Sequence, residues 1–166
     1  MNVGSFYLGL TFGPDVTGLS VTRFGGYNDA GFPPHSGDVV VWSAFDFDTT
    51  ITFAVPLVSV GIWYTSFDFL TLTAYDATNS LLGSVVGDPN TDGFFGVSQF
   101  LGISAPGISS VVISGIPGFF VFDDLTYEPV PEPASVVLVG SGLALLLLVR
   151  RRRRGAVRGY PGDPPC

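Results

Sequence analysis

The stretch at residues 70–75 reads Leu-Thr-Leu-Thr-Ala-Tyr, in which apolar side chains alternate with threonine and tyrosine. Successive side chains of a β-strand point to opposite faces of a sheet, so this period of two predicts a strand with one buried face. A second stretch, Phe-Phe-Val-Phe at residues 119–122, has the aromatic and β-branched composition that strands favour. Breakers such as Gly-Asp-Pro-Asn at residues 87–90 separate such stretches. The sequence therefore predicts short β-strands joined by turns.

The same pattern recurs along most of the chain, and no helical period lies between the expected strands. Many short strands without intervening helices are typical of an antiparallel sandwich. We therefore expect a mainly β fold, an antiparallel β-sandwich that covers residues 1–128. The expected strands are Ser5–Phe12, Leu19–Arg23, Val39–Trp42, Thr50–Val55, Ser59–Thr65, Leu70–Tyr75, Leu81–Val86, Gln99–Ser104, Ile108–Ser114 and Phe119–Tyr127.

Charge is distributed unevenly along the chain, whose formal net charge is −7. Residues 1–130 hold twelve acidic residues and a single basic one, Arg23, which gives this part a formal charge of −11. Such a domain repels nucleic acid and anionic lipid, so we expect no nucleic-acid partner. The one cysteine, Cys166, is the last residue, which excludes an intrachain disulfide and a cysteine-based metal site.

The C-terminal part has a different character. An uncharged apolar stretch at residues 134–149 is followed by five consecutive arginines, Arg150, Arg151, Arg152, Arg153 and Arg154. The stretch spans roughly 24 Å as a helix, and flanking arginines can snorkel to extend its reach across a bilayer core of about 30 Å. A buried core helix is excluded because five adjacent guanidinium groups cannot be buried unpaired. The sequence predicts one transmembrane helix, with the arginines as the membrane stop.

The arginines also predict the orientation of the chain. Positively charged flanks stay in the cytoplasm, so residues 150–166 are expected there as an Arg-rich tail and the β-sandwich is expected outside. Pro131 and Pro133 lack a backbone N–H and disfavour helix in the residues before them. Residues 130–133, within the segment 129–133 that precedes the apolar stretch, are therefore expected to form an extended strip that a protease can reach.

This order of motif, apolar helix and basic cluster resembles the PEP-CTERM family of bacterial sorting signals. Val130, Pro131, Glu132 and Pro133 match its Val-Pro-Glu-Pro signature residue for residue. The same tail also resembles the C-terminal domain of ice-binding proteins. The resemblance implies that the partner is exosortase, a membrane transpeptidase-like enzyme of bacteria that make exopolysaccharide, which cleaves near the motif. It implies a bacterial inner-membrane location, with the domain outside, followed by attachment to the cell surface or secretion.

Both ends of the sequence depart from that family. Family members usually stop soon after the basic cluster, whereas residues 155–166 continue as the extension GAVRGYPGDPPC. Family members begin with a secretory signal peptide, whereas residues 1–13, MNVGSFYLGLTFG, have no basic n-region and no small-residue cleavage site. We therefore expect the natural chain to begin upstream of Met1.

The domain before the tail carries a second resemblance. Residues 51–127 resemble the jelly-roll domain common in PEP-CTERM proteins, which is similar to galactose-binding and carbohydrate-binding sandwiches. The resemblance implies a non-catalytic protein of the cell envelope or extracellular matrix that contacts polysaccharide. Two alternatives stay open, a secreted carbohydrate-active hydrolase that uses its aspartates and an ice-binding or adhesion protein. No nucleophile elbow, phosphate-binding glycine loop or HExxH motif occurs, so the sequence does not support an enzyme.

One candidate calcium site lies in the turn after residue 87. Asp88, Asn90 and Asp92 occupy the alternating ligand positions of a D-x-N-x-D-G calcium loop, in which their oxygens converge on the ion. Position twelve of that loop is Gln99 rather than a bidentate glutamate, and neither flank is helical. A hairpin turn made of ordinary turn residues is the favoured interpretation.

A second candidate calcium site is the pair Asp123 and Asp124 near the end of the last expected strand. Strand alternation turns one carboxylate inward or along an edge, where a cation or hydrogen-bond donors must satisfy it. In jelly-roll binding domains an aspartate late in the last strands often holds a structural Ca²⁺. A loop that bonds the pair through its backbone amides is an equally good interpretation.

Aromatic side chains are candidates for stacking on sugar rings. Trp63 and Tyr64 are adjacent in an expected strand and must face opposite sides, so at most one of them belongs to the core. The single histidine, His35, has no second histidine or cysteine to join it and is expected to be a loop residue rather than a base or zinc ligand. The aromatic candidates are Tyr27, Phe32, Trp42, Trp63 and Tyr64.

Overall fold

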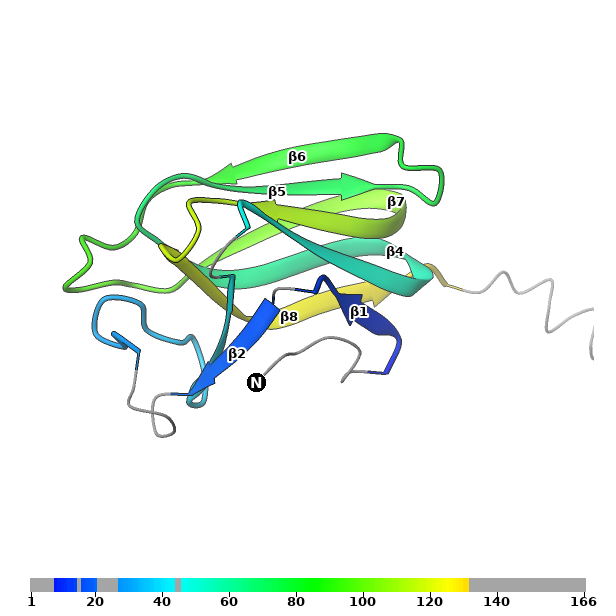
Figure 1. Cartoon of the computed structure of the whole chain (residues 1–166). Coiled ribbons are helices and arrows are strands. Elements are labelled where there is room, and N and C mark those ends of the chain that lie inside the picture. The colour runs from blue at the N-terminus through cyan, green and yellow to red at the C-terminus, as the bar shows by residue number, and fades with distance from the viewer. Residues whose placement is uncertain (1–7, 15, 21–26, 44–45, 132–166) are drawn as a thin grey trace, which may run out of the picture. The chain divides into compact units, whose positions relative to one another are not determined.

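The computed structural model describes residues 8–14, 16–20, 27–43 and 46–131 (Figure 1). These residues form eight β-strands and no α-helix, which confirms the mainly β fold. Every strand pairing among them is antiparallel. The strands are β1 (Leu10–Phe12), β2 (Val16–Ser20), β3 (Val39–Ser43), β4 (Asp48–Ser66), β5 (Leu70–Tyr75), β6 (Leu81–Gly87), β7 (Gln99–Ser114) and β8 (Phe120–Pro129).

The strands form two layers that share the long strands β4 and β7. In the first layer, the N-terminal part of β4 pairs with β1 and with the C-terminal part of β7, which continues to β5 and β6. In the second layer, the C-terminal part of β4 lies between the N-terminal part of β7 and β8, and β8 continues to β3 and β2. The continuous hydrogen bonding through β4 and β7 makes the two layers one folded-over sheet.

A single hydrophobic core lies between the two layers. The layers touch directly, because a side chain added at Gly87 of β6 would collide with the ring of Tyr64 from β4. Burial of the apolar side chains between the layers removes their surface from water, which is the main stabilising contribution to a fold of this kind. The sandwich is thereby confirmed. Fully buried members of the core include Ile51, Leu72 and Val111 from the first layer and Leu57, Ile62 and Phe120 from the second.

Two pairs of expected strands are in fact single bent strands, so the prediction of ten strands was wrong. Thr50–Val55 and Ser59–Thr65 are both part of β4, and Gln99–Ser104 and Ile108–Ser114 are both part of β7. Proline and glycine between these segments predicted strand ends. In a strand that passes from one layer to the other they mark bends instead.

The bend in β4 is visible in its burial pattern. The buried side chains before Pro56 have odd numbers, such as Ile51 and Phe53, whereas the buried apolar side chains after Leu57 have even numbers, such as Ile62 and Tyr64. The pairing of β4 with β7 shifts register on both sides of Leu57. A one-residue irregularity of this kind exchanges the two faces of a strand. Strand alternation read without this break would therefore place half of β4 with the wrong face inward.

The first strands also differ from their predicted bounds. Within the described residues, β1 covers only Leu10–Phe12 of the expected strand Ser5–Phe12, since Gly9 has a φ of +86° and turns the chain just before it. β2 covers Val16–Ser20 rather than Leu19–Arg23, and it pairs with β3 over its whole length. The remaining expected strands agree with the structure to within a few residues.

The chain divides into two units with the boundary between Val130 and Pro131. Among the described residues, no helix is long and apolar enough to cross a bilayer. Glu132, Pro133, the expected transmembrane helix at residues 134–149 and the arginines at residues 150–154 lie outside the described residues.

Candidate functional site

The last strand leads directly into the predicted sorting motif. β8 pairs with β4 as far as Pro129, which lies opposite Leu57, and the Val130 N–H then donates a hydrogen bond to the Pro56 carbonyl oxygen at 3.0 Å. Val130 and Pro131 are exposed. The described part of the motif is therefore accessible, as expected, and it begins without a linker after a paired strand.

A bulge near the middle of β8 decides where its two aspartates point. Asp123 lies opposite Trp63 and Thr126 lies opposite Gly61, so Asp124 and Leu125 share a single partner position on β4. Asp124 has a φ of +44°, in the left-handed region that bulges use. Because the bulge inserts one residue, both carboxylates bond the same loop instead of alternating between the faces. The sequence analysis missed this bulge.

Asp123 is buried and binds the backbone of the loop before β3. Its Oδ2 accepts hydrogen bonds from the His35 N–H at 2.7 Å and the Ser36 N–H at 3.1 Å. Burial raises the pKa of this carboxyl above its ordinary value, and the two backbone N–H groups oppose that effect. Asp123 therefore fixes the loop to the sheet through its backbone amides, one of the two arrangements that the sequence left open.

Asp124 binds the side chains of the same two loop residues. Its Oδ2 lies 2.7 Å from His35 Nδ1, and its Oδ1 accepts a hydrogen bond from Ser36 Oγ at 2.8 Å. These side-chain hydrogen bonds, His35 first, lower the pKa of Asp124. The serine hydroxyl bonds the carboxylate rather than the imidazole, so no base is placed to activate it as in a catalytic triad. We call Asp123 and Asp124 the loop-anchoring pair.

The imidazole of His35 is held a second time by an aromatic stack. It lies parallel to the Trp63 ring with 3.6 Å between the ring centroids, and Trp63 in turn contacts Phe100 edge-on at 5.7 Å. Trp63 is half-buried on the outer face while Tyr64 is buried in the core, as alternation predicts. His35 covers one face of Trp63, which leaves that face unavailable for stacking on a sugar.

The other aromatic candidates are dispersed. Tyr27, Phe32 and Trp42 are half-buried and form no ring contact with one another among the described residues. The Tyr27 hydroxyl is buried and has no hydrogen-bond partner among them. Its burial, followed by the charges of Asp29, Asp123 and Asp38, raises the pKa of Tyr27 to about 12. These five aromatic candidates therefore do not form one stacking surface among the described residues.

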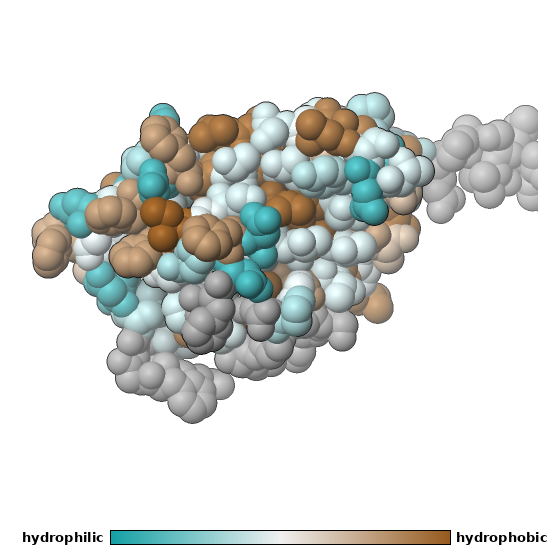
Figure 2. Space-filling model, turned by 45° about the horizontal axis from the view of Figure 1, so that its top comes forward, coloured by the Kyte–Doolittle hydropathy of each residue, from teal (hydrophilic) through white to brown (hydrophobic). Residues whose placement is uncertain are grey.

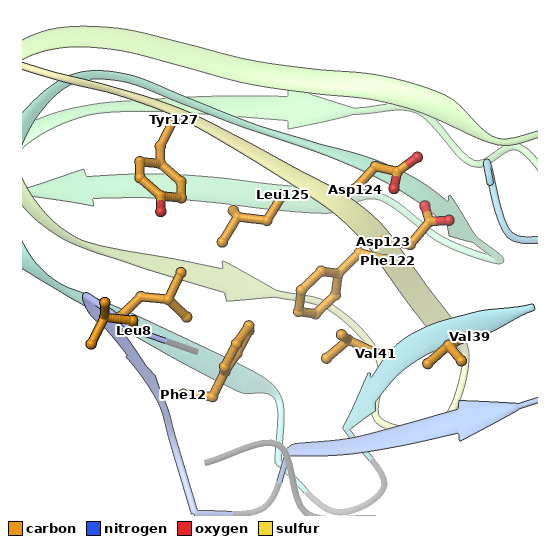
Figure 3. Close-up of a pocket in the computed structure, with 10 residues that line it drawn as sticks. Leu8, Phe12, Val39, Val41, Phe122, Asp123, Asp124, Leu125 and Tyr127 are labelled. Carbon is orange, nitrogen blue, oxygen red and sulfur yellow. The ribbon is translucent and has the colours of Figure 1, made fainter. Parts of the chain in front are cut away.

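An apolar pocket of about 380 Å³ opens where β1 and β8 part from the same edge of β4. Figure 3 shows Leu8, Phe12, Leu125 and Tyr127 facing a common space, while the carboxylates of the loop-anchoring pair point away from it. Hydrocarbon and the Tyr127 ring make up most of its lining, and Asp123 and Asp124 also form part of the wall. Both of these carboxylates already accept hydrogen bonds from the loop before β3.

The turn that contains Asp88, Asn90 and Asp92 is fixed by its own hydrogen bonds. Asn90 Oδ1 accepts from the Ser66 N–H at 2.7 Å and its Nδ2 donates to the Tyr64 carbonyl oxygen at 3.0 Å, which ties the turn to the end of β4. Asp92 Oδ1 accepts from two N–H groups of its own turn. The Asp88 carbonyl oxygen accepts from the Tyr64 hydroxyl. Two of the three expected calcium ligands therefore already have partners.

No group of three or more His, Cys, Asp or Glu side chains suited to a metal ion occurs in the described part of the chain. Four of the five candidate calcium ligands already accept hydrogen bonds from protein N–H or O–H groups, namely Asn90, Asp92, Asp123 and Asp124. A calcium ion would have to replace these bonds. Calcium stays a prediction at these positions, and its test is given below.

A surface that the sequence analysis did not select lies at the end of the sandwich where β4 ends and β8 begins. Phe67 contacts Phe119 with 5.9 Å between ring centroids and also lies against Gly93, the residue before Phe94. Three loops thus bring apolar rings together, and brown patches cluster at the same side of the molecule in Figure 2. We call this surface the phenylalanine end. Its exposed rings are Phe67 (47%), Phe69 (57%), Phe94 (76%), Phe95 (79%) and Phe119 (50%).

The tail of the chain matches a known family. Residues 129–154 match the PEP-CTERM protein-sorting motif. This match confirms the motif that the sequence predicted at Val130, Pro131, Glu132 and Pro133. The molecule is therefore a β-sandwich domain that continues into a C-terminal sorting signal. No curated protein sequence matches the chain.

Solved structures similar to the chain are β-domains with low sequence identity. A carbohydrate-binding module, TmCBM61 in complex with β-1,4-galactotriose, is 15% identical, with 77% of this chain and 92% of that chain covered and a TM-score of 0.43. CsCBM6-3 from Clostridium stercorarium, in complex with cellobiose, is 15% identical, with 78% and 94% covered and a TM-score of 0.43. The K2 adhesin domain of Lys-gingipain is 13% identical, with 68% and 89% covered and a TM-score of 0.42. At this level of similarity no ligand transfers to the chain.

Proposed function

We propose that this chain is an exported bacterial protein that exosortase sorts through residues 129–154, and that its β-sandwich contacts polysaccharide at the cell surface or in the matrix. The match of these residues to the sorting motif carries the proposal. In this proposal residues 134–149 span the inner membrane, the arginines at residues 150–154 stop transfer, and cleavage near the motif releases or attaches the domain.

The geometry of the exit from the domain supports processing at this position. β8 ends at Pro129, and Val130 keeps only one backbone hydrogen bond to the domain, from its N–H to Pro56. Pro131 and Pro133 cannot donate backbone hydrogen bonds, so the segment cannot extend the pairing of β8 with β4. An enzyme at the membrane surface can bind such a strip without first unfolding the sandwich.

The arrangement of carboxylates supports a non-catalytic domain. A glycosidase needs two carboxylates about 5–10 Å apart that flank a bound sugar. The adjacent pair in this domain, Asp123 and Asp124, instead anchors a loop, and the pocket beside it is apolar. Asp48 accepts a hydrogen bond from the Ser114 hydroxyl. These contacts are structural, so we expect no hydrolysis of polysaccharide by the purified protein.

Expression of the full chain behind a functional secretion signal, with and without an exosortase in the same host, tests the proposal. We expect a shorter, tail-free form in the surface or medium fraction only when exosortase is present. Glu132→Ala should abolish the shift, whereas the control Glu128→Gln, an exposed carboxylate just before the motif, should keep it. An identical mass with and without exosortase would contradict the proposal.

The outer face of the first layer favours a second candidate, ice binding. Hydroxyl side chains lie next to one another at two places across its strands: Thr73 is paired with Ser84, and Thr52 is paired with Thr11 and Ser110. A regular array of hydroxyl and methyl groups is the kind of surface that ordered water can match. An ice-recrystallisation assay on the chain and its Thr52→Lys variant tests this candidate, and equal inhibition by both would exclude this face.

A further inference from the structure

The phenylalanine end is remote from the end of β8 at which the chain leaves the domain. β8 begins at Phe120 beside Ser66 and ends at Pro129 beside Leu57, so the phenylalanine end and the chain's exit are at opposite ends of β8 (Figure 1). Exposed apolar rings at such a position mark an interaction surface rather than a folding core.

Two carboxylates are close to these rings in the chain. Asp68 lies between Phe67 and Phe69, and Asp92 lies two residues before Phe94. In each aspartate Oδ1 accepts backbone hydrogen bonds from its own turn, and Oδ2 has no hydrogen-bond partner among the described residues. Backbone N–H groups of Phe95 and Phe94 lower the pKa of Asp92, so it stays charged in mildly acidic surroundings. The surface thus offers apolar faces beside fixed anionic oxygens.

The negative charge of the domain limits the kinds of molecule that can bind to the phenylalanine end. The described residues contain no lysine and no arginine, so none of these carboxylates has a cationic partner of those types among them. A second copy of the chain docked end to end would bring Asp68 and Asp92 against their own counterparts, and like charges repel. Anionic lipid and anionic polymers are repelled for the same reason. The complementary partner is cationic and has apolar faces.

We propose that the phenylalanine end binds a polysaccharide that carries free amino groups. This inference rests on the proposed function, because it names the substrate class of the polysaccharide contact. The C–H faces of the sugar rings would stack on Phe67, Phe94 and Phe95, and the ammonium groups would pair with Asp68 and Asp92. A polymer presents both groups in every residue, which suits a surface whose phenylalanines and aspartates are close together in the chain. Binding would weaken as salt screens the exposed carboxylates.

Titration of the full chain, purified in uncharged detergent, with a β-1,4-linked glucosamine oligomer and its fully N-acetylated counterpart tests the inference. We expect the amino form to bind at least about tenfold more tightly, a difference of about 1.4 kcal/mol. The paired change Phe94→Ala and Phe95→Ala should weaken binding by about tenfold. Asp68→Asn with Asp92→Asn, which keeps the Oδ1 acceptors, should remove the preference for the amino form. The control Leu81→Ala, an equally exposed apolar residue at the other end, should have no effect.

Four results would overturn the inference. Equal affinity for the two oligomers would exclude the amino group as the determinant. If binding survives the loss of Phe94 and Phe95, the rings do not contribute to it. If a polylysine peptide binds as tightly and does not need the rings, charge attraction alone explains the binding. Absence of binding to either oligomer would remove this partner, while the exosortase-dependent change of mass would still test the sorting function separately. If the paired variant unfolds, Phe69→Ala tests the same surface.

Discussion

The two ends of the sandwich are held in different ways. At the phenylalanine end four loops are tied together: Asn90 bonds the end of β4, the side-chain amide of Asn28 donates to the Gly93 carbonyl oxygen at 2.6 Å, and Phe67 packs on Phe119. At the exit end a single strand leaves the sheet, and one hydrogen bond from Val130 to Pro56 is its last tie. The first end depends on the whole fold, whereas the second is a linear signal that an enzyme can bind in any extended chain.

The largest expected effect comes from the core that the phenylalanine end depends on. Phe122 is 1% exposed, and Phe122→Ala should lower the free energy of unfolding by about 3–5 kcal/mol. Urea denaturation of the full chain measures this loss, with Phe47→Ala, an exposed phenylalanine, as the control. The variant should lose glycan binding in proportion to unfolding but should still be cut by exosortase. Loss of cutting would show that the signal is not linear.

Asp123→Ala should have the next largest effect. It leaves the backbone N–H groups of His35 and Ser36 without their buried acceptor, which costs about 1–3 kcal/mol. Asp123→Asn keeps an acceptor and should lose much less. Urea denaturation compares the two, and the near-UV signal of Trp63 reports the loop locally because His35 stacks on it. Equal stability of both variants would mean that the loop is not anchored by this carboxylate.

Asn90→Ala should destabilise the phenylalanine end by about 1–2 kcal/mol, since the Ser66 N–H and the Tyr64 carbonyl oxygen lose their partner. The same variant also tests calcium at this turn. Because Asn90 Oδ1 and Asp92 Oδ1 already accept protein hydrogen bonds, we expect millimolar Ca²⁺ to leave the Tm of the wild-type chain unchanged relative to EGTA. A rise in Tm that disappears in Asn90→Ala would instead establish the calcium loop.

The smallest expected effect is a dependence on acidity. The hydrogen bonds to Asp124 lower its pKa in the folded state, so they contribute stability above the unfolded value of about 3.9 that is lost as the pH falls through the folded pKa. Asp123, whose pKa is raised by burial, has the opposite sign and loses stability as the pH rises above about 3.9. Thermal melts from pH 3 to 6 of the wild type and of Asp124→Asn measure the difference. The Tm of Asp124→Asn should fall less at low pH than the Tm of the wild type, because the variant has no carboxylate at this position to become protonated.

The same contrast between local and assembled features explains what the sequence could predict. Features that depend only on neighbours in the chain were predicted from patterns of a few residues. They are the motif at Val130 to Pro133, the strand Leu70–Tyr75 and the opposite facing of Trp63 and Tyr64. The register shift beside Leu57 depends on pairing with distant strands. The bulge at Asp124 has no strong local signal, because aspartate rather than glycine takes the left-handed position.

The phenylalanine end was missed for the same reason. Phe67, Phe94 and Phe119 are at least 25 positions apart, and only the sandwich places their loops together. In the sequence each resembles a core residue. Two features of the sequence did indicate exposure. The rings near Asp68 and Asp92 lie in turns rather than in alternating strands. Phe94 and Phe95 are consecutive, so they cannot both lie on one buried face.

The mass of the mature domain tests the central claim most directly. Intact-protein mass spectrometry should be performed on the domain recovered from cells that contain exosortase and from cells that lack it. The account predicts that exosortase yields a domain that ends within or next to residues 130–133, with the strand β8 complete, and that cells without the enzyme yield only the uncut chain. A cut inside β8, or the same cut in both kinds of cell, would contradict the account.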